Sequence, residues 1–256
     1  MKVIAIIPAR MSSSRFPGKP MADILGMPMI GHVYKRVKMS KALDEVYIAT
    51  CDKEIYSYAE SIGAKAVMTK DTHERASDRC AEAMLKIEEA NPADKCDIMV
   101  LVQGDEPLTH PNMIDEAVNP MLKDNSIKIT NLAGEITSQF DYENPNEVKA
   151  VMDKNWNAMY FSREPIPSKK KFSGAIPMYK QVPIIPFTRD FLLEYNEMEP
   201  TPLEIIESVD MLRVLENDIK IKMIPTKYKV KAVDVPADID VVLEMFKNDE
   251  LKSRYL

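Results

Sequence analysis

The sequence predicts an α/β fold with a mostly parallel central sheet and helices on both of its faces. In the first half of the chain, short apolar runs typical of buried strands alternate with amphipathic segments of helical periodicity. The first apolar run, Val3–Pro8, leads directly into a loop rich in basic residues. Loops at the carboxyl ends of parallel strands form the edge where open α/β sheets bind ligands. We therefore expect a ligand site immediately after the first strand.

Further strands and helices of the first half follow in regular alternation. The expected strands are Glu45–Thr50, Ala66–Met68 and Ile98–Val102, and the expected helices are Ile30–Met39, Lys53–Ile62 and Ser77–Ala90. Gly63 follows the second of these helices, as is typical of a helix C-terminus. The third helix offers an apolar face that consists of Ala81, Met84, Leu85 and Ile87.

The second half of the chain is less regular. Expected strands are Lys128–Leu132, Val148–Met152, Ala158–Phe161 and Ile219–Ile224, and expected helices are Leu203–Glu216 and Ala237–Asn248. We expect Thr201-Pro202 to open the first of these helices, since proline is tolerated in the first turn of a helix. The segment 162–180 is rich in Pro, Lys and Ser, and we expect a mobile loop over the ligand cleft. We predict one domain over residues 1–256, with an inserted lobe around 128–200.

Bulk composition limits the classes of function. A chain of 256 residues can bury a full core, and its net charge of -6 argues against general nucleic-acid binding. The three cysteines lack Cys-x-x-Cys spacing, so neither a disulfide framework nor a zinc site is indicated, and we expect a reducing cytoplasm. The first apolar run is too short for a signal peptide or a membrane span, so no membrane association is expected.

The loop Pro8–Pro20 concentrates positive charge after the first strand. It contains Arg10, Arg15 and Lys19, together with serines that include Ser13. Cations spaced this closely suit the phosphates of a nucleotide, whereas the alternative is a solvated basic turn. The loop is not a Walker loop, because that motif requires Gly-x4-Gly-Lys followed by Ser or Thr.

Two aspartates follow strand-like segments in the same way. Asp105 comes after the run Ile98–Val102 and beside Gly104, and Asp234 precedes the last expected helix. If both strands lie near the sheet centre, the two carboxylates share a magnesium ion, which neutralises a triphosphate before an oxygen nucleophile attacks it. The alternative for Asp234 is capping of the last helix, ahead of Pro236.

Several motifs, in the same order along the chain, resemble those of CMP-Kdo synthetase, the 3-deoxy-manno-octulosonate cytidylyltransferase family. They are the runs Pro8–Pro20, Gly26–Ile30, Val102–Pro107, Asn144–Lys149, Tyr160–Arg163 and Val233–Pro236. The resemblance implies a Rossmann-like nucleotidyltransferase fold of the glycosyltransferase-A-like type, with a small dimerisation lobe and a homodimeric assembly. It also implies transfer of CMP from CTP to an anionic sugar acid, with release of pyrophosphate.

Matching positions carry the family's site residues over to this chain. The resemblance implies that Arg10 and Lys19 bind CTP phosphates and that Asp105 and Asp234 hold Mg²⁺, which makes these four the expected catalytic set. The expected nucleotide-binding residues are Arg10, Ser13, Arg15, Lys19, Ser77, Arg79 and Gln103. The expected acceptor-binding residues are Lys149, Arg163, Gln181, Ile185 and Met211.

The chain departs from the family at three of the acceptor positions. Gln181 stands where the family has His, Ile185 where it has Tyr, and Met211 where it has Gln. Loss of a partner for a buried polar group costs about 1–3 kcal/mol, so such positions discriminate between substrates. We therefore expect transfer to Kdo or a modified ulosonic acid. The alternatives are a smaller carboxylate or phosphonate acceptor, and a non-catalytic nucleotide-binding paralogue.

A glycosyltransferase of the same fold class is a further alternative. Such enzymes normally carry an Asp-x-Asp metal motif after a central strand, and Gly104-Asp105-Glu106 does not supply one. The cationic loop after the first strand is also unexplained by that reading. The sequence therefore favours nucleotidyl transfer.

Overall fold

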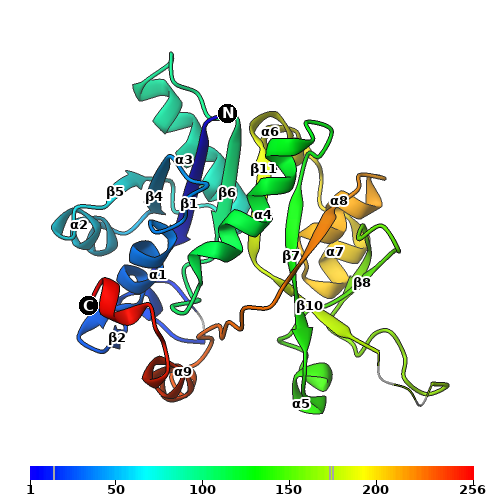
Figure 1. Cartoon of the computed structure of the whole chain (residues 1–256). Helices are drawn as coiled ribbons and strands as arrows, with labels where there is room; N and C mark the ends of the chain where they lie inside the picture. The colour runs from blue at the N-terminus through cyan, green and yellow to red at the C-terminus, as the bar shows by residue number, and fades with distance from the viewer. Residues whose placement is uncertain (14, 173, 175) are drawn as a thin grey trace. The chain divides into compact units, whose positions relative to one another are not determined.

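The computed structural model describes residues 1–13, 15–172, 174 and 176–256. Contacts divide the chain into two units, of which the first comprises Met1–Asp115 and Val230–Leu256 and the second comprises Glu116–Lys229 (Figure 1). The second unit is an insertion in the sequence of the first and is wider than the expected lobe at 128–200. That the units act as one domain stays a prediction.

The first unit contains the expected parallel sheet. Its strands are ordered β6 (Ile98–Val102), β1 (Val3–Ala9), β4 (Glu45–Thr50) and β5 (Lys65–Met68), and each neighbouring pair is parallel. β1 and β6 are buried along their whole length, as expected for parallel strands that are covered on both faces. The chain leaves β1 on one side to form β4 and β5, and returns on the other side to form β6. The strand order therefore reverses between β1 and β6, which marks the ligand-binding crevice of this fold class.

Helices and short elements complete the first unit. They are η1 (Lys19–Met21), β2 (Asp23–Ile24), β3 (Met27–Pro28), α1 (Met29–Val37), α2 (Lys53–Ser61), α3 (Ala76–Ala90), α9 (Asp238–Lys247) and η2 (Lys252–Arg254). The expected apolar face of α3 is wrong at Leu85, which is 45% exposed. The buried stripe runs through Ser77, Cys80 and Met84 at helical spacing, and Leu85 lies one residue past it.

A buried polar cluster ties the C-terminal residues to α1. His32 is 0% exposed, and its Nε2 lies 2.7 Å from the carbonyl oxygen of Ile24. Because a carbonyl only accepts, Nε2 carries the proton, and the Tyr255 hydroxyl, 2.9 Å away, donates to Nδ1. Arg36 Nε donates to the same hydroxyl at 2.9 Å. The cluster therefore requires neutral His32.

We expect the free energy of unfolding to fall with acidification through His32. Burial lowers the pKa of His32 below its ordinary value of 6.5; the bond to Ile24 and the charges of Asp23 and Asp249 oppose this, and Arg36 adds to it. Below pH 6.5, His32 is protonated in the unfolded chain but stays neutral in the folded chain. The free energy of unfolding therefore falls as the pH drops below this value. Urea unfolding at pH 7.5 and 5.5 should show a larger loss for the wild type than for His32→Asn. Equal losses would contradict this role.

The second unit contains a largely antiparallel sheet. Its strand order is β12 (Lys222–Thr226), β7 (Thr130–Ile136), β10 (Met178–Val182), β8 (Lys149–Met152) and β9 (Ala158–Ser162). Only the β12–β7 pair is parallel among these neighbours in the described chain. The remaining elements are α4 (Pro111–Lys123), which begins in the first unit, α5 (Gln139–Glu143), β11 (Ile184–Thr188), α6 (Arg189–Glu197), α7 (Pro202–Glu207) and α8 (Met211–Glu216).

Two expectations for the second unit are corrected. The helix expected over Leu203–Glu216 is divided into α7 and α8, because Ser208 adopts a left-handed conformation with φ +51°. Residues 178–180 of the expected loop belong to β10, and the described residues of 163–177 form no helix or strand. Residues 173 and 175 lie outside the described part, so mobility of the loop stays a prediction.

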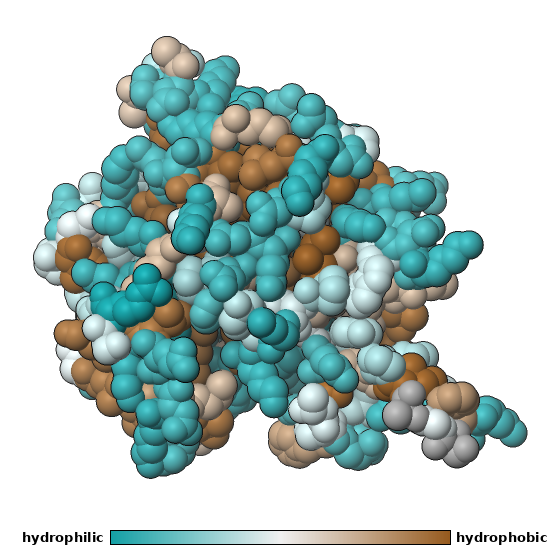
Figure 2. All heavy atoms as spheres, in the orientation of Figure 1, coloured by the Kyte–Doolittle hydropathy of each residue, from teal (hydrophilic) through white to brown (hydrophobic). Residues whose placement is uncertain are grey.

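The molecular surface is mainly hydrophilic on the face seen in Figure 2, with smaller apolar areas between the polar side chains. Charged residues make up 29% of the chain, which accounts for this coverage. Among the helices in the described residues, none combines the length and apolarity that a bilayer crossing requires.

Candidate active site

The cationic loop folds back on itself through the peptide of Met11. The Met11 carbonyl accepts the N–H groups of Ser13 and Gly18, each at 2.9 Å. Gly18 has φ +76°, a conformation that favours glycine, and it precedes Lys19 at the start of η1. The loop therefore returns Lys19 to the end of β1. Ser14 lies outside the described residues.

Asp105 follows β6 at the same edge of the sheet. A Cβ at Gly104 would lie 2.9 Å from the Pro8 carbonyl oxygen, so only glycine lets the ends of β6 and β1 approach this closely. The Val233 N–H donates to the Asp105 carbonyl at 2.9 Å, which places Asp234 beside Asp105. Three distant segments thus meet at the point where the strand order reverses.

A hydrophobic cluster anchors these three segments. Its buried members are Ile24, Met29, Leu108, Val233, Val242 and Phe246, with Phe16 packed against them. Phe16 neighbours Arg15, Val233 neighbours Asp234, and Leu108 lies three residues after Asp105. Burial of these apolar side chains therefore holds the charged residues in place.

Opposite charges alternate across the site. Lys19 Nζ lies 2.7 Å from Asp105 Oδ2 and 3.9 Å from Asp234 Oδ1, and Arg15 Nη2 lies 2.8 Å from Asp234 Oδ1. The Lys19 side chain is only 14% exposed, each aspartate is 26% exposed, and Arg15 is 54% exposed. The two carboxylates therefore converge on one ammonium group, and the assignment of chemical roles to them stays a prediction.

The carboxylate of Asp238, and not that of Asp234, binds the backbone that leads into α9. Asp238 Oδ2 accepts the backbone N–H groups of Asp234 and Val235 at 2.8 and 3.0 Å. Burial opposes ionisation of Asp238, but its bonds to Lys231 and to these N–H groups outweigh that effect and lower its pKa. The Asp234 side chain is directed to Arg15 and Lys19 instead. The capping alternative for Asp234 is therefore wrong.

The remaining predicted nucleotide residues lie near the carboxyl edge of the same sheet. Arg10 Nη1 donates to the His73 carbonyl at 3.2 Å, and Arg79 Nη1 donates to the Thr69 hydroxyl and to the Lys70 carbonyl. Gln103 is half-buried and follows β6 directly. Arg10 and Arg79 therefore both hold the segment 69–73.

Two buried donors at the start of α3 lack partners among the described residues. They are Ser77 Oγ and Arg79 Nη2, on side chains that are 2% and 3% exposed. An unpaired buried donor costs about 1–3 kcal/mol, which a ligand with acceptor oxygens recovers. These atoms are available to acceptor oxygens beside α3, and their part in nucleotide binding stays a prediction.

Lys149 and Arg163, expected to face an acceptor, instead bind the backbone of the second unit. Lys149 is 0% exposed, burial lowers its pKa, and its Nζ donates to the carbonyls of Asn144 and Arg163. The Arg163 guanidinium donates to the carbonyls of Glu207, Pro145 and Ser208 at 2.7, 2.9 and 3.1 Å. Both cations therefore hold backbone segments of the second unit, and their contact with an acceptor stays a prediction.

The other predicted acceptor residues differ in exposure. Gln181 is half-buried, and its Nε2 donates to Asn131 Oδ1 at 2.6 Å. Ile185 and Met211 are only 6% and 2% exposed, and so are part of the buried interior. Sequence reasoning missed Asn131, which is 0% exposed and follows the first residue of β7.

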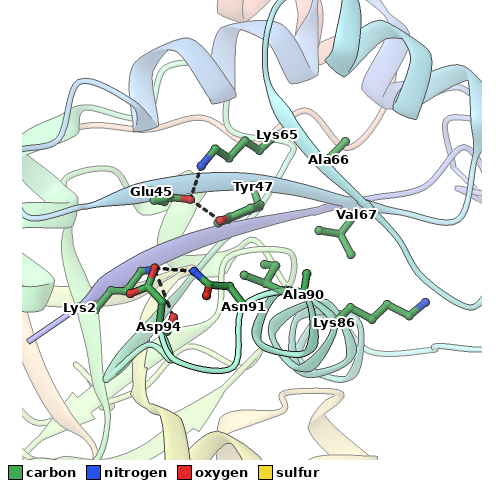
Figure 3. Close-up of a pocket in the computed structure, with 11 residues that line it drawn as sticks. Lys2, Glu45, Tyr47, Lys65, Ala66, Val67, Lys86, Ala90, Asn91 and Asp94 are labelled. Carbon is green, nitrogen blue, oxygen red and sulfur yellow. Dashed lines mark hydrogen bonds and ion pairs between the residues drawn. The ribbon is translucent and has the colours of Figure 1, made fainter.

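A pocket of about 350 Å³ at the other edge of the first-unit sheet is a poorer candidate (Figure 3). Lys2 and Asp94 line it as an ion pair, as do Lys65 and Glu45, whose charged atoms are 2.6 Å apart. The Tyr47 hydroxyl also donates to Glu45. Because these charges satisfy one another, the pocket does not match the charge pattern expected for a nucleotide site.

Comparison with known proteins identifies the family to which the chain belongs. The model of a family described as "Cytidylyltransferase" matches residues 4–221. A relative from Geobacter metallireducens, named 3-deoxy-manno-octulosonate cytidylyltransferase, is 42% identical over 254 residues, covering 95% of this chain and 97% of the relative. A relative of the same name from Thermodesulfovibrio yellowstonii is 43% identical over 247 residues, covering 94% and 96%.

Solved structures agree with these relatives. A structure of CMP:2-keto-3-deoxy-manno-octonic acid synthetase complexed with CTP has a TM-score of 0.89 and 34% identity, covering 96% of this chain and 99% of that chain. A 4-diphosphocytidyl-2C-methyl-D-erythritol synthase from Anaerococcus prevotii has a TM-score of 0.62 and 13% identity, covering 96% and 99%, and it supports the fold alone. The chain therefore belongs to the 3-deoxy-manno-octulosonate cytidylyltransferase family of nucleotidyltransferase enzymes.

Proposed function

We propose that this enzyme transfers the cytidylyl group of CTP to 3-deoxy-manno-octulosonate (Kdo) and releases pyrophosphate. The observation that carries the proposal is the meeting of Asp105 and Asp234 at Lys19, where the strand order of the sheet reverses. The names of relatives at 42% and 43% identity, and of a structural neighbour complexed with CTP, support these substrates.

Cationic side chains of the first unit are proposed to bind the nucleotide. Lys19 and the exposed Arg15 exchange carboxylate contacts for phosphate oxygens when CTP binds, and Arg10 adds a further cation. The buried donors described above orient the remainder of the nucleotide. The full proposed set is Arg10, Ser13, Arg15, Lys19, Ser77, Arg79 and Gln103.

The donor set suits Mg²⁺. Asp105 and Asp234 offer carboxylate oxygens, and one ammonium group already contacts both, so the position attracts a cation. Groups of three or more His, Cys, Asp or Glu side chains suited to a metal are absent from the residues that the structure describes. One or two carboxylates are what magnesium commonly takes when phosphates supply further oxygens. When bound, it supplies positive charge that offsets repulsion between the triphosphate and the attacking oxygen.

The proposed reaction requires no protein nucleophile. An acceptor hydroxyl oxygen forms a bond to the α-phosphorus of CTP, and the bond from that phosphorus to the β-phosphate oxygen breaks. Pyrophosphate leaves with the electron pair of that bond, and the hydroxyl proton passes to solvent. Lys19 and Arg15 stabilise the charge that develops on the leaving group.

We propose Kdo over the other acceptors because both relatives described above are named 3-deoxy-manno-octulosonate cytidylyltransferase, and Kdo is 3-deoxy-manno-octulosonate. The full proposed acceptor set is Lys149, Arg163, Gln181, Ile185 and Met211. Of these, Gln181 is half-buried, and its amide offers both donor and acceptor atoms. We further propose a homodimer, on the family resemblance. We also propose a reducing cytoplasm, because the spacing of Cys51, Cys80 and Cys96 in the sequence indicates neither a disulfide framework nor a zinc site.

An assay of pyrophosphate release tests the function. With CTP and Mg²⁺, we expect kcat/KM for Kdo to exceed that for an amino-substituted ulosonic acid, a small carboxylate or a phosphonate by at least about tenfold. Mass spectrometry of the product checks that CMP is attached to the acceptor. Preference for another acceptor would replace Kdo, whereas CTP binding without turnover on any acceptor would favour the non-catalytic alternative.

A further inference from the structure

Asp52 stands at a helix-capping position, but its carboxylate makes a different bond. It is the N-cap residue of α2, yet its side chain forms no capping bond within the described chain. Its Oδ2 instead accepts the Met11 N–H at 2.8 Å, across 41 residues of sequence. Aspartate is among the preferred capping residues, so α2 forgoes this stabilisation. The carboxylate is directed to the cationic loop.

Met11 is the residue through which the loop is closed. Its carbonyl accepts the N–H groups of Ser13 and Gly18, while its own N–H is held by Asp52. Gly18 is bonded covalently to Lys19, whose ammonium contacts both site aspartates. A continuous series of bonds therefore leads from Asp52, through Met11 and Gly18, to Lys19.

The charge of Asp52 is unfavourable for phosphate binding in itself. A carboxylate beside a loop that receives a triphosphate repels that ligand. Asp52 is half-buried, and its bond to the Met11 N–H is of the charge-assisted kind, which is stronger than a neutral hydrogen bond. Its placement is thus accounted for by fixing the loop and not by attracting the nucleotide.

We propose that Asp52 is a positioning residue for CTP: it fixes the Met11 peptide so that the loop presents Arg15 and Lys19 to the triphosphate. The proposal rests on the proposed function. Asp52 does not touch the reacting atoms in this account. It acts through the loop, so its loss weakens CTP binding more than it slows the chemical step.

Asp44 provides a matched control at the other end of the same two strands. It directly precedes β4, and its Oδ2 accepts the Val3 N–H at 2.7 Å. Asp52 directly follows Cys51 after β4 and makes the same kind of bond just beyond the carboxyl end of β1. Asp44→Ala therefore removes an equivalent bond at the opposite edge of the sheet.

The experiment compares four variants of the full chain by steady-state kinetics, calorimetric CTP binding and melting temperature. Asp52→Ala should raise KM and Kd for CTP about tenfold, with kcat within about threefold of wild type. Asp52→Ser retains a capping hydroxyl but is too short for the Met11 bond, so it should fold and show the same rise. Asp52→Asn keeps an acceptor oxygen and should stay within about threefold. Asp44→Ala should leave KM within about twofold.

Three outcomes would overturn the proposal. The first is an unchanged KM in Asp52→Ala and Asp52→Ser beside an active wild type. The second is an Asp52→Asn variant as impaired as Asp52→Ala, because the charge and not the bond would then matter. The third is an equal rise of KM in Asp44→Ala, which would indicate a general loss of stability. A wild type that neither binds nor turns over CTP would instead refute the proposed function.

Discussion

Asp105→Asn is expected to lower kcat for pyrophosphate release by about a thousandfold while the protein stays folded. The amide keeps the size of the side chain but removes the negative charge that a divalent cation needs. It also leaves Lys19 without the partner that lies 2.7 Å from its ammonium group. The rate is measured with saturating CTP and Kdo, and the melting temperature of each variant is recorded in parallel.

Asp97→Asn is the matched control for this substitution. Asp97 lies at the other end of β6, where its carboxylate accepts the Lys2 N–H at 2.6 Å. Removal of the Asp97 charge should lower the melting temperature slightly and leave kcat within about twofold of the wild-type value. Asp234→Asn should resemble Asp105→Asn, and the double variant should be little worse than either, because the two carboxylates act as one unit. Normal turnover in either single variant would remove the basis for the metal proposal.

The sheet and its ligand edge were predictable because they depend on local patterns. The apolar runs Val3–Pro8 and Ile98–Val102 indicate buried parallel strands, and β1 and β6 are buried along their whole length. A polar residue that follows such a strand lies at the carboxyl edge, which predicts the neighbourhood of Asp105. Gly104 adds the close approach to Pro8 that brings the two strand ends together.

The second unit was less predictable because its key contacts have no sequence pattern. Lys149 and Arg163 bind backbone carbonyls, which every residue offers, so residue type alone does not distinguish this role from contact with an anion. The break between α7 and α8 occurs at Ser208, where neither glycine nor proline signals it. Conversely, Pro120 lies inside α4, a helix that the sequence analysis did not predict.

Asp52 illustrates a local pattern that predicts the wrong partner. An aspartate directly before the helical segment Lys53–Ser61 indicates an N-cap. The competing partner, the Met11 N–H, becomes available only once β1 and β4 pair side by side. Tertiary structure therefore directs to Met11 a side chain that stands at an N-cap position in the sequence.

Lys19→Met is expected to have opposite effects on turnover and on metal binding. Loss of the ammonium removes a phosphate ligand, so kcat/KM for CTP should fall about a hundredfold. It also leaves Asp105 and Asp234 without the cation that contacts both of them. In the absence of nucleotide, Mg²⁺ no longer competes with that ammonium, and its affinity should rise about fivefold. Calorimetric titration with magnesium chloride measures the second effect.

The opposite signs distinguish a local role of Lys19 from a general loss of structure. An unfolded or distorted site would lose both turnover and metal binding. Removal of one competing cation instead raises the affinity for Mg²⁺ while turnover falls. Lys65→Met is the control, because Lys65 also lies in an ion pair, 2.6 Å from Glu45, but at the amino edge of the sheet. It should change neither quantity by more than about twofold. Weaker Mg²⁺ binding in Lys19→Met than in the wild type would mean that the two carboxylates do not form the cation site.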